Sequence, residues 1–153
     1  MTNTARKWVL RISNLDRFVP KGDSVKDEFD LLSFSHGIYA HSLPDGSRQV
    51  QMQDINVMRA SDAATPVLFK LCLSGDVLDS VVLELRTIDD DRDVFLLRYE
   101  LLKARVAAVN PGGSPQSGDP ALVEGLTFTC ERLRMHVHNR DGHSTVDLTP
   151  PKP

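Results

Sequence analysis

Residues Val77–Val109 read VLDSVVLELRTIDDDRDVFLLRYELLKARVAAV, and this stretch decides the fold class. Its first part carries apolar residues at every second position, at Val81, Leu83 and Leu85, and a second alternating run follows the acidic segment DDDRD. A period of two is typical of β-strands that bury one face, whereas a helix repeats about every 3.6 residues. Two such runs on either side of a short polar turn predict a β-hairpin.

The alternation changes phase near the end of this stretch and in two other places. After Leu101 the apolar residues move to the opposite parity, and the same slip occurs at Gln53-Asp54 and between Cys130 and Leu133. A slip of one residue turns the following side chains to the other face of a sheet. Such strands either turn a corner and serve two packed sheets or curl one sheet into a barrel. We therefore expect a mainly β fold of long, bent antiparallel strands.

The remaining strands and loops follow from the same periodicity and from turn residues. Besides the hairpin, the predicted strands are Trp8–Ile12, Glu28–Tyr39, Gln49–Arg59, Glu124–His138 and Ser144–Leu148. The predicted connections are the loops Asp16–Asp27, Ala40–Arg48 and Asn110–Pro120, and a tight turn at Asp141-Gly142. Residues 1–153 are expected to form one domain, with a frayed tail over about residues 146–153 because its prolines cannot extend a ladder.

The helix signal lies in Ser61–Leu73. Thr65 is expected as the N-cap, Pro66 as the first helical residue and Gly75 as the C-terminal stop. Between them almost every residue is apolar and only Lys70 is charged, whereas a surface helix should carry a broad polar face. The helix is therefore either buried on both sides within one barrel or, as we favour, packed with its second side against another subunit.

Composition and charge exclude several functional classes. The chain has 153 residues, 41% of them hydrophobic, and a formal net charge of −3. Without a polybasic run, neither nucleic acid nor an anionic membrane is expected as a partner. No apolar run approaches the length of a membrane span, and the N-terminus lacks the apolar core of a secretory signal. We expect synthesis in the cytoplasm and, if the protein is exported, a route that reads no signal peptide.

A metal site is conceivable near the C-terminus. If Asp141-Gly142 is a two-residue turn, His136 falls opposite Asp147 and His138 opposite Thr145, which would place two histidines and an aspartate side by side as zinc ligands. The alternative, which we favour, is a solvated strand face.

The other reactive residue types suggest no active site. Ser33 and Ser35 lack the surrounding glycines of a nucleophilic serine, and the run Asp89-Asp90-Asp91 matches no calcium loop. Cys72 and Cys130 are interpreted as reduced core thiols, with a disulfide or a catalytic cysteine as the open alternative. We expect no enzymatic activity and no cofactor.

Several stretches together carry a family resemblance. They are FDLLSFSHG at Phe29–Gly37, VQMQDINVMRASDAATP at Val50–Pro66, LSG at Leu73–Gly75, VVLELR at Val81–Arg86, LLKARVAAV at Leu101–Val109 and LVEGLTFTCERLRMHV at Leu122–Val137. In order and spacing they resemble the Hcp (haemolysin-coregulated protein) family, the tube subunit of type VI secretion systems. The resemblance covers most of the chain.

The resemblance implies both a fold and an assembly. The implied fold is a two-sheet β-barrel with one α-helix packed on its side. The implied assembly is a homohexameric ring that stacks into a hollow, ejected tube and carries or chaperones small effectors in its lumen. Its implied partners are a spike protein at the tube tip and a contractile sheath with its baseplate. A stand-alone small β-barrel that binds or hydrolyses a ligand is the alternative.

The resemblance and the local pattern together suggest where the contacts lie. Ser33 and Ser35 are expected to face the lumen, because Leu32 and Phe34 should take the core face. The residues expected at the subunit interface are Val67, Phe69, Lys70 and Leu73. The residues expected to help rings stack are Leu43, Pro44, Asp45 and Gly46, in a loop (Ile38–Arg48) shorter than the usual loop of the family.

Overall fold

The computed structural model describes residues 4–115 and 122–151, and strands dominate it. The strands are β1 (Thr4–Ile12), β2 (Glu28–Asp30), β3 (Ser33–Ser35), β4 (Ile38–Ser42), β5 (Arg48–Met52), β6 (Ile55–Ala60), β7 (Val81–Asp89), β8 (Arg92–Leu102), β9 (Arg105–Gly112), β10 (Val123–Thr129), β11 (Arg132–Asn139) and β12 (Gly142–Leu148). The helices are the 3-10 turn η1 (Leu15–Phe18) and α1 (Thr65–Ser74). Within the described ranges, neither helix is long and apolar enough to cross a membrane.

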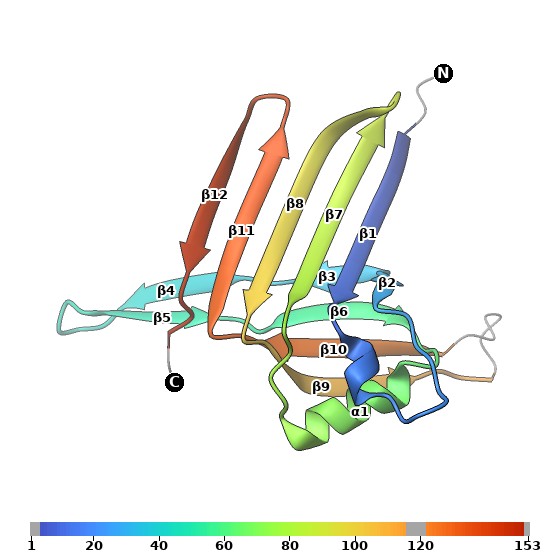
Figure 1. The fold of residues 1–153 in the computed structure, drawn as a ribbon. Helices are drawn as coiled ribbons and strands as arrows, with labels where there is room; N and C mark the ends of the chain where they lie inside the picture. The colour runs from blue at the N-terminus through green and yellow to red at the C-terminus, as the bar shows by residue number, and fades with distance from the viewer. Residues whose placement is uncertain (1–3, 116–121, 152–153) are drawn as a thin grey trace.

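The strands form antiparallel sheets of six, four and two strands. The six-stranded sheet has the order β12-β11-β8-β7-β1-β2, the four-stranded sheet the order β3-β6-β10-β9, and β4 pairs with β5. In Figure 1 the six-stranded sheet stands upright, the four-stranded sheet crosses beneath it with α1 below, and the β4–β5 hairpin projects to the left. The mainly β class is confirmed. The barrel is looser than expected, because none of these sheets closes on itself in the described part of the chain.

β7 and β8 form the hairpin predicted from Val77–Val109. Asp89 lies opposite Arg92, so Asp90 and Asp91 make a two-residue turn. Their φ angles are 48° and 63°, the left-handed conformation that such turns favour at both central positions. Aspartate is one of the few residues besides glycine that tolerate it.

Each phase change in the sequence marks a passage from one sheet to another. β8 ends at Leu102 in the six-stranded sheet and β9 begins at Arg105 in the four-stranded sheet, with Lys103 at a φ of 52° in the corner. The slip at residues 53–54 separates β5 from β6, and the slip after Cys130 separates β10 from β11. The corner interpretation is therefore confirmed, and each long strand predicted there is in fact two strands.

The segment Glu28–Tyr39, predicted as one strand, is divided among three sheets as β2, β3 and the start of β4. Leu31 is buried, whereas Leu32 is 62% exposed. The expectation that Leu32 takes the core face is wrong, because the chain crosses between sheets at these residues and the alternation restarts in β3. Phe34 does pack against the core, as expected.

α1 begins one residue earlier than predicted. Thr65 is its first residue and Ala64 occupies the N-cap position. Gly75 ends the helix as predicted, with a φ of 71° and its N–H donating to the Leu71 carbonyl at 2.9 Å. The buried residues of α1 are Val67, Leu68 and Leu71, and they join the core between the two larger sheets.

The C-terminal hairpin turns one residue earlier than predicted. Asn139 lies opposite Gly142. The Asn139 side-chain oxygen accepts hydrogen bonds from the backbone N–H groups of Asp141 (2.9 Å) and Gly142 (3.0 Å), which fixes this turn. Strand structure then continues to Leu148, so the expected tail begins later than residue 146.

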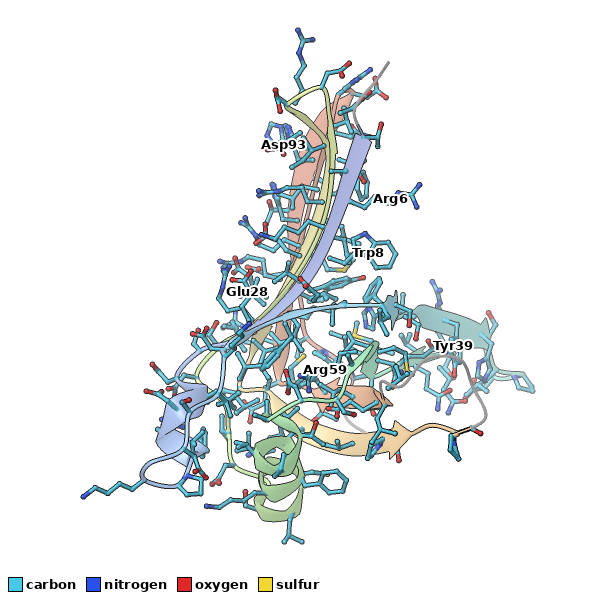
Figure 2. All side chains as sticks on the ribbon, turned by 90° about the vertical axis from the view of Figure 1, so that its right-hand side faces the viewer. Arg6, Trp8, Glu28, Tyr39, Arg59 and Asp93 are labelled. Atoms are coloured by element: carbon cyan, nitrogen blue, oxygen red, sulfur yellow. The ribbon has the colours of Figure 1, made fainter. Side chains whose placement is uncertain are left out.

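A buried ion pair joins the four-stranded sheet to the start of α1. Arg59 and Glu124 are 1% and 0% exposed, and Arg59 Nη1 donates to Glu124 Oε2 at 2.8 Å. Arg59 also pairs with Asp62 at 2.5 Å, and its guanidinium lies 4.4 Å from the centroid of the Phe29 ring. The Thr65 hydroxyl donates to the other Glu124 oxygen at 2.5 Å. In Figure 2, Arg59 lies inside the molecule above α1.

The sequence carried a signal for this pair that the pattern analysis missed. Arg59 shares the parity of Val57, and Glu124 shares the parity of Leu126, so both charges occupy core positions of their strands. The register places the two residues directly opposite one another. Charged residues at core positions predict a buried partner, because an unpaired buried charge is very costly.

Leu71→Ala is expected to lower the free energy of unfolding by about 2–5 kcal/mol, because the Leu71 side chain is fully buried. The control is Leu122→Ala, because Leu122 is 54% exposed and lies just before β10, outside the predicted subunit contacts, so stability should change by less than about 0.5 kcal/mol. Urea denaturation of the purified variants measures the difference. Equal midpoints for the two variants would contradict the packing of α1.

Glu124→Ala is expected to destabilise the fold by about 3–5 kcal/mol, because it leaves the Arg59 charge buried without its partner. A double variant, Arg59→Met with Glu124→Leu, removes both charges and should be more stable than Glu124→Ala alone. Chemical denaturation at neutral pH gives both values. A double variant that is less stable than Glu124→Ala would show that the pair is not the main role of these residues.

Candidate functional site

α1 leaves an apolar face exposed. Phe69 is 47% exposed and Leu73 is 91% exposed, and Lys70 is exposed beside them. Val67, predicted to belong to the same interface, is instead 6% exposed and packs into the core of its own chain. The helix therefore leaves Phe69, Lys70 and Leu73 available for a contact outside the chain, whereas Val67 stabilises the fold.

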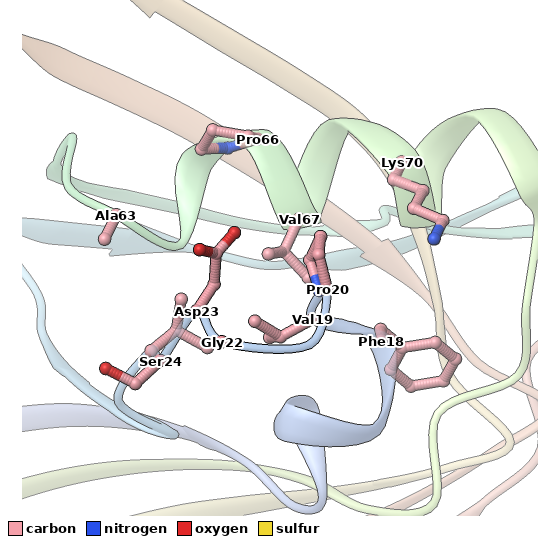
Figure 3. A pocket seen from close by; sticks show the side chains of 11 residues that line it. Phe18, Val19, Pro20, Gly22, Asp23, Ser24, Ala63, Pro66, Val67 and Lys70 are labelled. Atoms are coloured by element: carbon pink, nitrogen blue, oxygen red, sulfur yellow. The ribbon is translucent and has the colours of Figure 1, made fainter.

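A groove of about 440 Å³ lies between α1 and the loop that precedes β2 (Figure 3). Val67 lines it from the helix, and Val19 and Pro20 line it from the loop. The Asp23 carboxylate and the Lys70 ammonium supply its polar groups. The groove thus extends the apolar surface of α1 sideways.

The hairpin of β4 and β5 projects from the body of the chain (Figure 1). Every residue of β4 is exposed. The exposed large apolar side chains of the hairpin are Ile38, Tyr39, Leu43 and Val50. An isolated two-stranded hairpin is marginally stable in water. With these side chains exposed, this hairpin has little of the packing that usually stabilises such an element.

The tip of the hairpin is the tight turn formed by the residues predicted for ring stacking. Leu43 N–H donates to the Ser47 carbonyl at 2.8 Å, and Gly46, with a φ of 89°, donates to the Leu43 carbonyl at 2.9 Å. The Asp45 carboxylate accepts from the Ser47 hydroxyl at 2.6 Å and from its N–H at 2.9 Å. The hydrogen bond from the Ser47 hydroxyl has the largest effect in lowering the pKa of Asp45, and the hydrogen bond from the Ser47 N–H comes second. The tip therefore keeps a negative charge.

His36 lies at the base of the hairpin. Its ring stands edge-on to Tyr99 of β8, with centroids 5.3 Å apart and Nδ1 3.3 Å from the Tyr99 hydroxyl. Burial lowers the pKa of His36, against the opposing effects of a hydrogen bond with the Gln53 backbone and the charge of Asp54. Gln53 N–H donates to the Gly37 carbonyl at 2.8 Å, and this bond closes the base.

Ser33 and Ser35 lie on the outward face of the four-stranded sheet. Both are exposed, and Phe34 between them is partly buried. They are paired with β6, with Ser33 opposite Met58 and Ser35 opposite Asn56. Their place on a lumen wall stays a prediction, because a lumen requires several copies of the chain.

The outward face of the six-stranded sheet is highly charged. Its ion pairs include Arg11–Glu28 (3.1 Å), Arg98–Glu84 (3.6 Å), Arg134–Glu100 (3.6 Å) and Arg134–Asp147 (2.7 Å). In Figure 2, Glu28 lies on this side of the sheet and Trp8 lies on the other. Exposed ion pairs add little stability individually, so their main effect is to keep this face hydrated.

The opposite face of the same sheet is apolar. Its lower part packs on the core, and its upper part extends beyond the four-stranded sheet (Figure 1). There Trp8 and Leu97 are partly buried, while Phe95 and Val146 are exposed. The upper part is thus another apolar surface that this chain does not cover.

The structure does not bring His136, His138 and Asp147 together. His136 lies opposite Thr145, with its Nδ1 2.6 Å from the threonine hydroxyl, and Asp147 lies opposite Arg134 and binds it. The predicted juxtaposition is wrong because the hairpin turn lies one residue earlier, which shifts the pairing by two positions. Among the described residues, no group of three or more His, Cys, Asp or Glu side chains is placed to hold a metal ion.

Cys72 and Cys130 are free and partly buried against the core. Burial, with a smaller contribution from the Asp54 charge, raises the pKa of Cys130 to about 11. Its thiol is therefore protonated at neutral pH and is a poor nucleophile.

The family described as "Type VI secretion system effector, Hcp" matches this chain over residues 20–136. That range takes in β2 through most of β11, and hence the β4–β5 hairpin, α1 and the whole four-stranded sheet, but it leaves out β1 and β12 of the six-stranded sheet. No curated protein matches the chain.

Solved structures share the fold at low sequence identity. Hcp1 of Salmonella typhimurium is 24% identical with a TM-score of 0.69, and 95% of this chain and 94% of that chain are covered. Hcp2 of the same organism is 22% identical with a TM-score of 0.64 and 94% coverage of both chains. A double mutant of Hcp1 from E. coli EAEC 042 is 15% identical with a TM-score of 0.69, covering 95% of this chain and 99% of that chain.

The pH dependence of stability should report the burial of His36. Its pKa lies below the usual 6.5 in the folded state, so below that pH the unfolded chain takes up a proton more readily than the folded chain. Stability should therefore fall as the pH drops below about 6.5 and level off once folded His36 is also protonated. Replacement by asparagine, His36→Asn, should remove this component from denaturation curves collected between about pH 5 and pH 7.5.

The matched control is His41→Asn, at an exposed histidine of β4 in the same hairpin. This variant should keep the pH dependence of the wild type. If His36→Asn and His41→Asn had equal effects, His36 would not be the group responsible.

Proposed function

Because the chain belongs to the Hcp family of type VI secretion proteins, we propose that it is the tube subunit of such a system. In this proposal it assembles into homohexameric rings, and the rings stack into a hollow tube whose lumen carries small effector proteins. The tube bears a spike protein at its tip and is driven outward by a contractile sheath anchored on a baseplate. The role is structural, and no catalytic step is assigned to the chain.

The observation that carries the assembly is a pair of unlike apolar surfaces that the chain leaves uncovered. One is the helical face of Phe69 and Leu73 with the groove beside it. The other is the β4–β5 hairpin, with Ile38 and Tyr39 exposed. A closed ring needs a heterologous contact, in which two different patches meet head to tail. Two unlike patches on one chain meet that requirement, whereas a monomer would expose both to water.

Each predicted contact residue has a role in this proposal. Phe69, Lys70 and Leu73 lie between neighbouring subunits of one ring. Leu43, Pro44, Asp45 and Gly46 lie between rings, where the fixed turn presents a rigid tip with one negative charge. Ser33 and Ser35 line the lumen.

The same assembly accounts for export. A tube driven through the apparatus leaves the cell as folded rings, so its export depends on ring formation and reads no N-terminal address. The chain would fold in the cytoplasm and be secreted afterwards. Folding before export suits the two thiols, which are free in the structure.

Phe69→Glu tests the ring. A buried, unpaired carboxylate at a subunit contact is costly, whereas in the monomer residue 69 is 47% exposed and should tolerate the charge. We expect a folded, soluble variant that gives the mass of one chain in native mass spectrometry, where the wild type gives the mass of six. In the bacterium that carries the apparatus, the variant should be missing from the culture supernatant.

The matched control is Leu122→Glu, which places the same charge at a residue that is 54% exposed and lies just before β10. It should form hexamers and be exported. A wild-type protein that stays monomeric at high concentration would overturn the proposal, and so would normal secretion of a Phe69→Glu variant shown to be monomeric.

A further inference from the structure

The β4–β5 hairpin is joined to the rest of the chain through two short segments. One is residues 36–37, between β3 and β4, and the other is residues 53–54, between β5 and β6. Within the described residues, the two strands of the hairpin pair only with each other, and in Figure 1 the hairpin projects clear of the larger sheets. Its direction therefore depends on how the two segments are held, and we call these segments together the hinge.

Contacts at both segments hold the hinge in its observed position. The Gln53 N–H donates to the Gly37 carbonyl at 2.8 Å and ties one segment to the other. His36 ties the hinge to the six-stranded sheet, because its ring stands edge-on to Tyr99 of β8 and its Nδ1 lies 3.3 Å from the Tyr99 hydroxyl. Tyr99 is 5% exposed and packs on Phe34 with ring centroids 5.3 Å apart, so it offers His36 a fixed point.

A cavity of about 270 Å³ lies beside the hinge. His36, Met52 and Asp54 line it from the hinge, and Cys130 lines it from the β10–β11 corner. Met52 packs partly on the core, whereas the ring of His36 is half-buried and borders the open space. The cavity therefore gives water access to this ring and leaves it room to turn from Tyr99 toward Asp54.

The titratable groups around His36 come from three elements, namely Tyr99 from β8, Asp54 from the β5–β6 corner and Cys130 from the β10–β11 corner. Burial raises the pKa of Tyr99, and burial with a smaller contribution from Asp54 raises the pKa of Cys130 to about 11. Both groups are thus neutral between about pH 5 and pH 7.5, and Asp54 supplies the charge. Burial lowers the pKa of His36, while a hydrogen bond with the Gln53 backbone and the Asp54 charge oppose this effect. Both opposing groups lie on the other segment of the hinge.

We propose that the contact of His36 with Tyr99 fixes the direction of the β4–β5 hairpin at neutral pH, and that protonation of His36 breaks this contact and frees the hairpin. A protonated imidazole accepts no hydrogen bond, so the Tyr99 hydroxyl can no longer donate to it. Against the buried Tyr99 ring the new charge loses hydration, whereas beside the cavity it gains water and the counter-charge of Asp54. The hinge then keeps its backbone bond and the partial packing of Met52, and the hairpin can change direction.

The consequence for a tube rests on the proposed function, whereas the hinge itself belongs to the single chain. In that proposal the hairpin tip, residues 43–46, lies between rings, and the exposed face of α1 lies between subunits of one ring. A hairpin freed in acid would therefore weaken the contact between rings and leave the contact within a ring intact. Stacked rings should separate into single rings at about pH 5, below the ordinary range of histidine titration.

Pulsed electron paramagnetic resonance can measure the direction of the hairpin. Spin-labelled amino acids in place of Ser42 of β4 and Asp30 of β2, both exposed, report one distance, and an excess of unlabelled chain keeps the measurement within one chain. We expect one distance at about pH 7.5 and a second distance, or a broader distribution, toward pH 5, with a midpoint below about 6.5. An unchanged distribution over the whole pH range in which circular dichroism shows intact strands would overturn the proposal.

Three variants assign the response to His36. His36→Asn should give a distribution that does not change with pH, and the matched control His41→Asn, at an exposed histidine of β4, should respond like the wild type. Asp54→Asn should move the midpoint to lower pH, because it removes the charge that favours protonated His36. A response that persists in His36→Asn, or a midpoint that Asp54→Asn leaves in place, would contradict the inference.

Analytical ultracentrifugation of the unlabelled protein tests the consequence for the tube. Wild-type protein should sediment as stacked rings at about pH 7.5 and as hexamers at about pH 5, whereas His36→Asn should show no such change. Rings that stay stacked while the hairpin moves would overturn this consequence. Wild-type protein that forms no hexamer at either pH is a failure of the proposed function instead, and the distances within one chain still decide whether the hinge responds to His36.

Discussion

The buried ion pair of Arg59 and Glu124 is the interaction on which the arrangement of surfaces depends. Removing two charges from water costs several kcal/mol, and their attraction compensates only when the remaining polar groups are bonded as well. Here Asp62 binds the Arg59 guanidinium and the Thr65 hydroxyl binds Glu124, while the buried Nε of Arg59 has no hydrogen-bond partner. Since Arg59 comes from β6, Glu124 from β10, Asp62 from the connection before α1 and Thr65 from the first position of α1, a single set of contacts fixes the register of the two strands and the entry of the helix. The exposed face of α1 and the outward face of the four-stranded sheet are thereby held in one constant relation.

The corners between sheets impose the second constraint. Near residues 53–54 the chain leaves the exposed β4–β5 hairpin, and near residues 103–104 and 130–131 it passes between the two larger sheets. On both sides of these last two corners the apolar residues face the same core. Each sheet is consequently left with one outward face that is free of the demands of packing. The outward face of the six-stranded sheet carries ion pairs from β2 to β12, whereas the outward face of the four-stranded sheet is mostly small and polar, with Arg105 opposite Thr129 at its β9 side.

The sequence predicts this fold wherever a strand is long enough to show its period. The hairpin β7–β8 and all three corners could be read from alternation, whereas β2 and β3 have three residues each, too few to show a period, so Leu32 was placed on the wrong face. The register predicted for β11 and β12 was wrong by two positions. The Asn139 side chain accepts hydrogen bonds from the backbone N–H groups of Asp141 and Gly142, and this places the turn one residue earlier. Val67 was predicted as a contact residue but is buried. The prediction was wrong because the sequence of a helix that is apolar on all sides does not reveal which side packs against its own core.

A chain that assembles, as proposed for this one, must reconcile two opposing demands. Its apolar contact surfaces must be large enough to bind a neighbour, yet before assembly they are exposed to water and favour unspecific association. The uncovered apolar side chains include residues of α1, of the β4–β5 hairpin and of the upper part of the six-stranded sheet, so they are dispersed over the described surface. That charged face disfavours burial, because any protein docking on it must displace the water around the Arg134 and Glu84 ion pairs without offering better partners. In the proposed ring, the charged face would restrict where a second copy can bind, so the geometry of assembly would depend on the excluded surface as well as on the attractive ones.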